Sequence, residues 1–188
     1  MEKLYLTEDS LIQDSFRLGV KIFESGFRPT FIVGIWRGGS SVGIYVQECL
    51  QTLGVDTDHI SVRTSYQGLP SYESMVSDPD SIRVHGTQYL IENLNADDSV
   101  LLVDDVFSTG MSMTATLRRL RKKLKKNCPS DIRIATLYKR AYYQRGDIEP
   151  DFFLHETTNW LVFPYELKGL TAEEIRINKP YLHQILSS

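Results

Sequence analysis

The sequence predicts an α/β fold, with a mainly parallel, twisted sheet flanked by helices. Short, almost wholly apolar runs, which suit strands buried on both faces, alternate with segments of helical periodicity. This alternation implies right-handed crossovers between parallel strands, with ligands collected at the carboxyl ends of the strands. The chain has 188 residues, of which 41% are hydrophobic and 24% charged, as expected for one soluble globular domain.

The first helix is predicted between residues 8 and 26, where apolar side chains recur near a helical period and Gly26 stops the pattern. A later helix carries seven Lys and Arg residues between positions 118 and 126, but its leucines form a core stripe. We therefore interpret the cations as a solvated helix face. The elements between these helices and after them are a strand at 29–35, a turn at 36–43, a helix at 44–54, and strands at 58–63, 99–105 and 131–138.

The chain is predicted to form a single domain, residues 1–188. Its longest irregular segment, residues 65–87, is rich in Gly, Pro, Ser and Asp and is too long for an ordinary connection. It therefore predicts a mobile functional loop. The last part of the chain, residues 147–188, begins with an aromatic, irregular stretch and predicts a small lobe, or hood, over one edge of the sheet.

Composition and charge exclude several classes of protein. The net charge of −3 leaves the whole chain without the excess of positive charge that is typical of nucleic-acid-binding proteins. The first residues show no basic region followed by an apolar one, so neither a targeting segment nor membrane association is expected. Two cysteines lie far apart, and four histidines lack metal-ligand spacing. We expect a cytoplasmic protein.

The stretch VDDVFSTGMS, residues 103–112, indicates a binding site. A strand, a turn and a helix in this order place backbone N–H groups at a helix N-terminus, where they and the helix dipole can bind a phosphate monoester. Asp104 and Asp105 precede this anion site and can accept hydrogen bonds from sugar hydroxyls. The stretch therefore predicts a ribose 5-phosphate site, whose phosphate is bound by Ser108, Thr109, Gly110, Met111 and Ser112.

This stretch is similar to the phosphoribosyl pyrophosphate signature of type I phosphoribosyltransferases. The resemblance covers the chain from the first helix to Glu166. It implies the fold of that family and small-molecule substrates, phosphoribosyl pyrophosphate and a base. It also implies assembly as a homodimer or homotetramer.

Two further segments resemble the family where it binds and encloses pyrophosphate. Arg37, Gly38 and Gly39 look like the pyrophosphate loop, because glycines let the backbone approach and Arg37 brings a fork of N–H donors. In the family this turn often contains a cis peptide, here at Trp36–Arg37. Ser65 and Tyr66 match a serine-tyrosine pair on the mobile loop of hypoxanthine-guanine phosphoribosyltransferases, whose closure would exclude water.

The resemblance also implies how the base and the metal are bound. Lys139 ends the last predicted strand, where its ammonium could donate to the 6-oxo group of a purine. The segment from Trp160 to Glu166 resembles the W-x-x-x-P-[WY]-[DE] segment of xanthine and related phosphoribosyltransferases. Trp160 would stack on the base, and Leu161 would contact it through its backbone. The implied cofactor is Mg2+, beside the pyrophosphate, with Glu166, Asp104 and Asp105 as its carboxylates.

Ser108 departs from the pattern, because most 6-oxopurine members carry an aspartate there that is thought to act on N7 of the purine. A serine can only hydrogen-bond. The leading hypothesis is nonetheless a 6-oxopurine phosphoribosyltransferase of purine salvage, with Asp104, Asp105, Ser108 and Lys139 as catalytic residues. Two alternatives stay open: a non-catalytic regulator that binds phosphoribosyl pyrophosphate or a nucleotide, and transfer to another base such as adenine.

Overall fold

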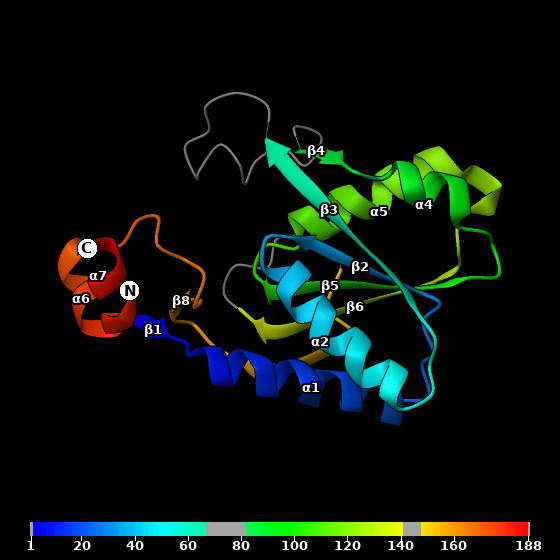
Figure 1. Cartoon of the computed structure of the whole chain (residues 1–188). Coiled ribbons are helices and arrows are strands. Elements are labelled where there is room, and N and C mark those ends of the chain that lie inside the picture. The colour runs from blue at the N-terminus through cyan, green and yellow to red at the C-terminus, as the bar shows by residue number, and fades with distance from the viewer. Residues whose placement is uncertain (1, 67–81, 141–147, 188) are drawn as a thin grey trace. The chain divides into compact units, whose positions relative to one another are not determined.

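The computed structural model describes residues 2–66, 82–140 and 148–187 (Figure 1). The chain divides into two compact units. The sheet unit comprises Ile12–Thr158, and the terminal unit combines Met1–Leu11 with Asn159–Ser188. No helix in the described ranges is long and apolar enough to cross a membrane.

The sheet unit is built on a sheet with the strand order β4-β3-β2-β5-β6-β7. Neighbouring strands are parallel except at one edge, where β4 runs antiparallel to β3. The predicted α/β class and mainly parallel sheet are thus confirmed. The strands are β2 (Phe31–Trp36), β3 (Asp58–Tyr66), β4 (Ile82–His85), β5 (Ser99–Phe107), β6 (Asp131–Lys139) and β7 (Phe152–Glu156).

Helices cover both faces of this sheet. Helices α1 (Glu8–Glu24) and α2 (Gly38–Thr52) lie on one face, and α4 (Gln88–Asn93) and α5 (Met111–Leu124) lie on the other (Figure 1). The leucine stripe of α5 packs against strand residues of β2, β5 and β6 in one buried cluster. Most of the cations of α5 are exposed, which supports their interpretation as a solvated helix face.

The structure differs from the predictions at several element ends. Strand β3 continues to Tyr66, because residues 63–66 pair with β4, so residues 65–66 and 82–85 of the predicted loop lie in strands. Its central part, residues 67–81, lies outside the described residues. Helix α2 begins at Gly38, inside the predicted turn at 36–43. Strand β7 belongs to the sheet unit, and the C-terminal part of the terminal unit begins at Asn159, whereas the hood is predicted from residue 147.

The terminal unit joins the two ends of the chain. Strand β1 (Lys3–Tyr5) pairs in parallel with β8 (Trp160–Val162). Helices α6 (Ala172–Asn178) and α7 (Pro180–Ser187) follow. A capping box between Thr171 and Glu174 starts α6, and Glu174 also forms an ion pair of 2.5 Å with Lys3.

His59 in β3 is a buried group whose titration is expected to make the stability of the protein depend on pH. Its Nδ1 lies 3.2 Å from Oε1 of Gln47, while no partner for its buried Nε2 exists among the described residues. Burial lowers the pKa of His59, and the charge of Asp58 opposes that shift. The folded state therefore disfavours the charged imidazole, whereas the unfolded chain takes up a proton near pH 6.5.

We expect the free energy of unfolding to fall as the pH drops below about 6.5, because protons then favour the unfolded chain. The His59→Gln variant should lose part of this pH dependence, which urea unfolding at pH 7.5 and pH 5.5 would measure. Equal pH dependence in the two proteins would contradict the role of His59.

Candidate functional site

The acidic pair lies within β5, near its carboxyl end. Asp104 is opposite Thr136 of β6, and the strand continues for three residues beyond it, to Phe107. The predicted strand stopped at residue 105. The backbone N–H of Asp105 donates to Oδ1 of Asp104 at 3.0 Å, and that of Val106 donates to Oδ1 of Asp105 at 2.7 Å.

Asp104 carries the strongest electrostatic perturbation of this region. Burial raises its pKa well above the usual range, and the neighbouring carboxylate of Asp105 adds to the shift. A backbone hydrogen bond from Gly39 opposes it. The carboxyl of Asp104 is thus held in a place that disfavours its charge, next to the start of α2.

The turn after β5 encloses a small cavity of about 100 Å³. Gly110 precedes α5 with a φ of 74°, a left-handed conformation that favours glycine. The first N–H groups of an α-helix have no intrahelical acceptors, so those at the start of α5 are suited to an anion. The cavity is lined by Asp104, Val106, Phe107, Ser108, Thr109, Gly110, Met111, Ser112 and Met113.

Two hydroxyl groups of this turn differ in their partners. Thr109 Oγ1 accepts a hydrogen bond of 3.3 Å from the N–H of Met111. Ser108 Oγ is buried, and no hydrogen-bond partner for it exists within the described part of the chain. The Ser108 hydroxyl can therefore bond to a ligand in the cavity without breaking a bond inside the protein.

The predicted pyrophosphate loop lies at the start of α2. The Trp36–Arg37 peptide is cis, as the resemblance implies. Arg37 is exposed, and Gly38 and Gly39 form the first turn of the helix. A Cβ on Gly39 would lie 2.2 Å from the carbonyl oxygen of Val103, so only glycine lets this loop reach β5.

Lys139 ends β6 directly opposite Phe107. Its side chain is 13% exposed, and its ammonium donates to Oε2 of Glu149 at 2.9 Å, with Oε1 of Glu156 at 4.0 Å. The ring of Phe153 lies 5.4 Å from the same nitrogen. Neither carboxylate was predicted from the sequence. Glu156 lies at the end of β7, and that strand was not predicted either.

Ser65 and Tyr66 lie at the end of β3, not in an irregular loop. Ser65 is opposite Arg83, and its Oγ lies 2.8 Å from Nε2 of His85. Tyr66 is opposite Ile82, and its side chain lies outside the described residues. Loop closure over a ligand therefore stays a prediction.

Trp160, Leu161 and Glu166 belong to the terminal unit. Trp160 is 44% exposed at the start of β8, whereas Leu161 is buried. The carboxylate of Glu166 accepts a hydrogen bond of 3.0 Å from the N–H of Phe163. The predicted site residues are therefore divided between the two units, with the acidic pair, the phosphate turn, the pyrophosphate loop and Lys139 in the sheet unit.

A buried lysine of the terminal unit was also missed by sequence reasoning. Lys179 is 4% exposed, and its ammonium donates to the carbonyl oxygens of Phe163 at 2.9 Å and Pro164 at 2.7 Å. Burial lowers its pKa, while the carboxylates of Glu8 and Glu166 oppose the shift. Lys179 thus ties the chain after α6 to the turn that carries Glu166.

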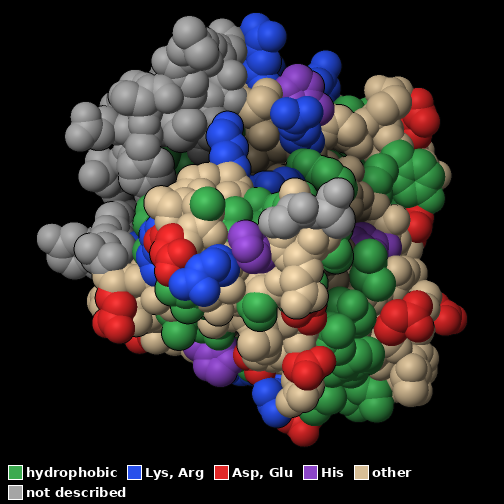
Figure 2. Space-filling model, turned by 60° about the vertical axis from the view of Figure 1, so that its left-hand side comes forward, with side chains coloured by type: hydrophobic (Ala, Val, Ile, Leu, Met, Phe, Trp, Pro, Cys, Tyr) green, Lys and Arg blue, Asp and Glu red, His purple; other side chains and the backbone are tan. Residues whose placement is uncertain are grey.

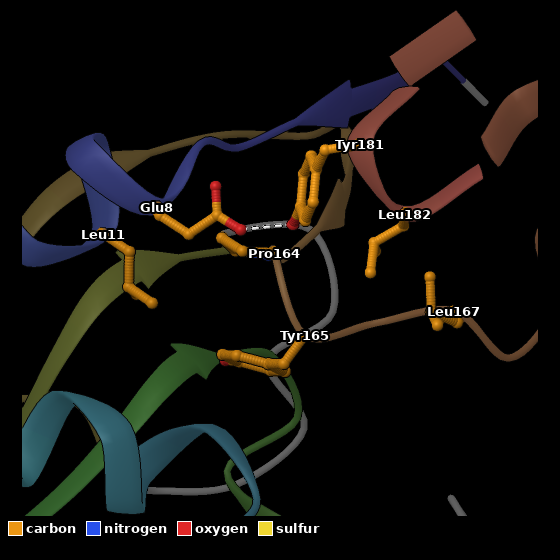
Figure 3. A pocket seen from close by; sticks show the side chains of 7 residues that line it. All are labelled: Glu8, Leu11, Pro164, Tyr165, Leu167, Tyr181 and Leu182. Atoms are coloured by element: carbon orange, nitrogen blue, oxygen red, sulfur yellow. Dashed lines mark hydrogen bonds between the residues drawn. The ribbon is translucent and has the colours of Figure 1, made fainter. Parts of the chain in front are cut away.

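The same unit contains a pocket of about 340 Å³ (Figure 3). The carboxylate of Glu8 accepts a hydrogen bond from the hydroxyl of Tyr181 on one side of it. Its other walls are mainly apolar and come from Leu11, Pro164, Tyr165, Leu167 and Leu182. None of the residues predicted to bind substrate lines this pocket.

The fold is shared with many solved structures, among them the following three. One is a purine phosphoribosyltransferase from Pyrococcus horikoshii OT3, with 22% identity and a TM-score of 0.65, covering 91% of this chain and 98% of that one. A hypothetical protein from Neisseria gonorrhoeae with bound ppGpp has 17% identity and a TM-score of 0.70, covering 96% and 97%. The xanthine-guanine-hypoxanthine phosphoribosyltransferase of Helicobacter pylori has 17% identity and a TM-score of 0.62, covering 88% and 95%.

These structural similarities show the fold alone. The family is shown by a match of the sequence. No match is found among curated proteins. Residues 5–169 match the family described as the phosphoribosyl transferase domain. This range contains the acidic pair, the phosphate turn and the pyrophosphate loop, and it ends before α6. The chain belongs to the phosphoribosyl transferase domain family.

Proposed function

We propose that the protein transfers ribose 5-phosphate from phosphoribosyl pyrophosphate to a 6-oxopurine, namely hypoxanthine, guanine or xanthine, and releases pyrophosphate. The observation that carries this proposal is the cavity at the start of α5, where groups suited to phosphate adjoin a carboxyl suited to sugar hydroxyls. The family supplies the class of reaction. The likeness to purine enzymes from Pyrococcus horikoshii and Helicobacter pylori supports a purine as acceptor.

Different groups of residues would bind different parts of phosphoribosyl pyrophosphate. The amides and hydroxyls of residues 108–112 would bind the 5-phosphate, and Asp104 and Asp105 the 2- and 3-hydroxyls of the ribose. Arg37 and the glycines after it would bind the leaving pyrophosphate. Charge develops on the ribose and the pyrophosphate during such a transfer, so donors and carboxylates fixed in place beforehand supply much of the rate.

Magnesium suits this donor set. Asp104 and Asp105 are adjacent, and the raised pKa of Asp104 marks a place where a cation would relieve the repulsion between two carboxylates. Mg2+ commonly takes one or two carboxylates together with substrate phosphates, so a cage of protein ligands is not required. When bound, the ion would neutralise charge on the pyrophosphate. Glu166 is the third proposed carboxylate.

Lys139 is proposed to select a base with a carbonyl at the 6-position. An ammonium has three N–H donors. Among the described residues, Glu149 alone lies within hydrogen-bond distance of it, since Glu156 is 4.0 Å away. A donor therefore remains for the purine oxygen. Trp160 would stack on the base, and Leu161 would contact it through its backbone.

Ser108 is proposed to bond to the base in place of the usual aspartate. Ser108 lines the cavity, and its buried hydroxyl has no hydrogen-bond partner among the described residues. It can orient a purine nitrogen, although it cannot act as a base at neutral pH. Losing a general acid or base typically lowers a rate by about 10² to 10⁴, which slows an enzyme without abolishing it.

The test is to incubate the protein with phosphoribosyl pyrophosphate, Mg2+ and each of hypoxanthine, guanine, xanthine and adenine, and to follow nucleotide formation by chromatography. We expect turnover with at least one 6-oxopurine, and none after chelation of Mg2+. In the Lys139→Met variant, the ratio of kcat/KM for that base to kcat/KM for adenine should fall about tenfold or more. The Lys122→Met variant, which removes an exposed charge of α5, should keep it.

Two other outcomes would redirect the proposal. Turnover with adenine alone would assign a different base. Tight binding of phosphoribosyl pyrophosphate without product from any base would instead indicate a non-catalytic regulator. Ser108 and the likeness to the Neisseria gonorrhoeae protein with bound ppGpp favour this second function. The cytoplasmic location and assembly as a homodimer or homotetramer stay predictions.

A further inference from the structure

Lys179 is a buried cation of the terminal unit. Lysine and arginine side chains normally lie at the surface, as the blue atoms in Figure 2 show for one face of the molecule. Among the described lysines, Lys179 alone is buried, with 4% of its surface exposed. A buried ammonium is stable only where fixed hydrogen bonds and nearby negative charge replace its water. Its partners are therefore held in defined positions.

These partners belong to three parts of the terminal unit. The backbone N–H of Lys179 donates to the carbonyl oxygen of Ile175 in α6 at 2.8 Å, and its own carbonyl oxygen accepts from the N–H of Leu182 in α7 at 3.0 Å. Its ammonium donates to the carbonyl oxygens of Phe163 at 2.9 Å and Pro164 at 2.7 Å. The side chain thus attaches the junction of α6 and α7 to the turn that follows β8.

This turn, residues 163–166, fixes the carboxylate of Glu166. The N–H of Glu166 donates to the carbonyl oxygen of Phe163 at 3.0 Å, and the N–H of Phe163 donates to Oε2 of Glu166, also at 3.0 Å. The carbonyl oxygen of Phe163 therefore accepts from both Glu166 and Lys179. A movement of that carbonyl would move the Glu166 carboxylate as well.

Strand β8, which carries Trp160 and Leu161, has little support of its own. Its three residues pair only with β1, in a sheet of two strands. Such a pair is marginally stable unless it packs against further elements. Lys3, the register partner of Trp160, forms an ion pair with Glu174 of α6, but the pair is partly exposed and contributes little. The buried, charged hydrogen bonds of Lys179 are the stronger attachment.

We infer that Lys179 is a positioning residue for the base: through the turn at residues 163–166 it fixes Trp160 and Leu161 for the purine and Glu166 for Mg2+. The inference rests on the function proposed above. The ammonium is committed to two carbonyl oxygens, so it acts through the turn and not on a substrate. The match to the family ends at residue 169, so helices α6 and α7 are an addition to the family domain that supports base recognition.

The test follows nucleotide binding by the fluorescence of Trp160. The sequence has two tryptophans, so Trp160 is the one reporter in a Trp36→Phe background, in which all further variants are made. Titration with GMP should give saturable quenching. Lys179→Met, which keeps the apolar stem and removes the charge and its N–H donors, should weaken GMP binding about tenfold or more. Lys168→Met, at an exposed position in the same unit, should leave the affinity unchanged.

A purely structural role of Lys179 would give a different pattern. Ribose 5-phosphate, whose proposed cavity at β5 lies in the sheet unit, should bind to Lys179→Met as tightly as to Lys168→Met in calorimetry. In transfer assays, the KM for the base and the Mg2+ concentration for half-maximal rate should rise about tenfold, with a much smaller change in kcat. Loss of folded protein would instead lower the rate at every concentration and leave KM unchanged. Lys179→Arg, which keeps the charge and N–H donors, should recover most of the GMP affinity.

The results that overturn the inference are distinct from those that overturn the reaction. If Lys179→Met is folded by circular dichroism and binds GMP as tightly as Lys168→Met, Lys179 positions nothing. If Lys179→Met does not fold, Lys179→Gln replaces it as a shorter, uncharged donor, and unchanged affinity for GMP has the same meaning. Absence of quenching by GMP in the Trp36→Phe protein would also overturn the inference. A protein that makes no nucleotide from any base, but loses GMP affinity in Lys179→Met, would contradict the proposed reaction and support the role of Lys179.

Discussion

The Asp104→Asn variant is expected to be more stable than the natural protein and at the same time a much poorer phosphoribosyltransferase. Burial and the carboxylate of Asp105 raise the pKa of Asp104, so the folded state holds its charge unfavourably at neutral pH. Asparagine removes that charge and keeps an oxygen for the N–H of Asp105. We expect a gain of about 0.5 to 2 kcal/mol in the free energy of unfolding.

The same substitution removes a carboxylate from the proposed ribose site. Charged hydrogen bonds to sugar hydroxyls are lost, so kcat/KM should fall by about tenfold to a hundredfold or more. The opposite signs of the two effects are the informative result, because a merely damaged fold would lower both stability and activity. Substrate sites commonly trade stability for function in this way.

Scanning calorimetry at two pH values measures the stability effect. For an acid with a raised pKa in the folded state, stability falls as the pH rises from the pKa of the unfolded chain toward the higher folded pKa. The difference in Tm between Asp104→Asn and the natural protein should therefore be larger at pH 7.5 than at pH 5. Asp97→Asn, at an exposed position, should change neither Tm nor transfer. A lower Tm for Asp104→Asn would contradict the account.

The Gly39→Ala variant is expected to lose both stability and nearly all transfer. The added Cβ would lie 2.2 Å from the carbonyl oxygen of Val103 and 3.0 Å from Cα of Asp104. Both are backbone atoms of the buried strand β5, so either α2 or the strand must shift. Overpacking of this kind typically costs about 1 to 3 kcal/mol, and the shift would also displace the pyrophosphate loop from the acidic pair. We expect kcat/KM to fall at least about a hundredfold.

Gly43 of the same helix offers a matched control. A Cβ there would meet the imidazole of His59 at 2.7 Å, and a side chain can move where a strand backbone cannot. Gly43→Ala should therefore cost some stability in urea unfolding but keep most of the transfer activity. If Gly39→Ala were as active as Gly43→Ala, the close approach of α2 to β5 would not matter for the reaction.

The apolar runs of the sequence predicted the strands that are buried on both faces, such as β2 and β5. They did not predict β4 and β7, which are short strands at the two edges of the sheet and owe their form to pairing with β3 and β6. The start of α2 was missed for a similar reason. Glycines at positions 38 and 39 are poor helix formers, and the close packing of α2 on β5 overrides that preference.

Some parts of the candidate site could be predicted from the sequence and others could not, again according to whether they depend on local sequence or on strand pairing. The acidic pair and the phosphate turn were predictable, because ten consecutive residues place them at one strand end. The partners of Lys139 were not, since Glu149 and Glu156 reach it only through the pairing of β6 with β7. Lys179 gave no sequence signal either, because it lies beyond the residues that match the family and reaches Phe163 and Pro164 only in the folded chain.

The pairing of β1 with β8 also sets an order of events during synthesis on the ribosome. Residues 3–5 leave the ribosome well before their strand partners at 160–162 and the helices after them. At bacterial or eukaryotic rates of translation, on the order of 10 s pass between the two. The sheet unit has all of its strands before that time and can fold while synthesis continues. The terminal unit can form only after its last helices have been made, so it becomes native later than the sheet unit.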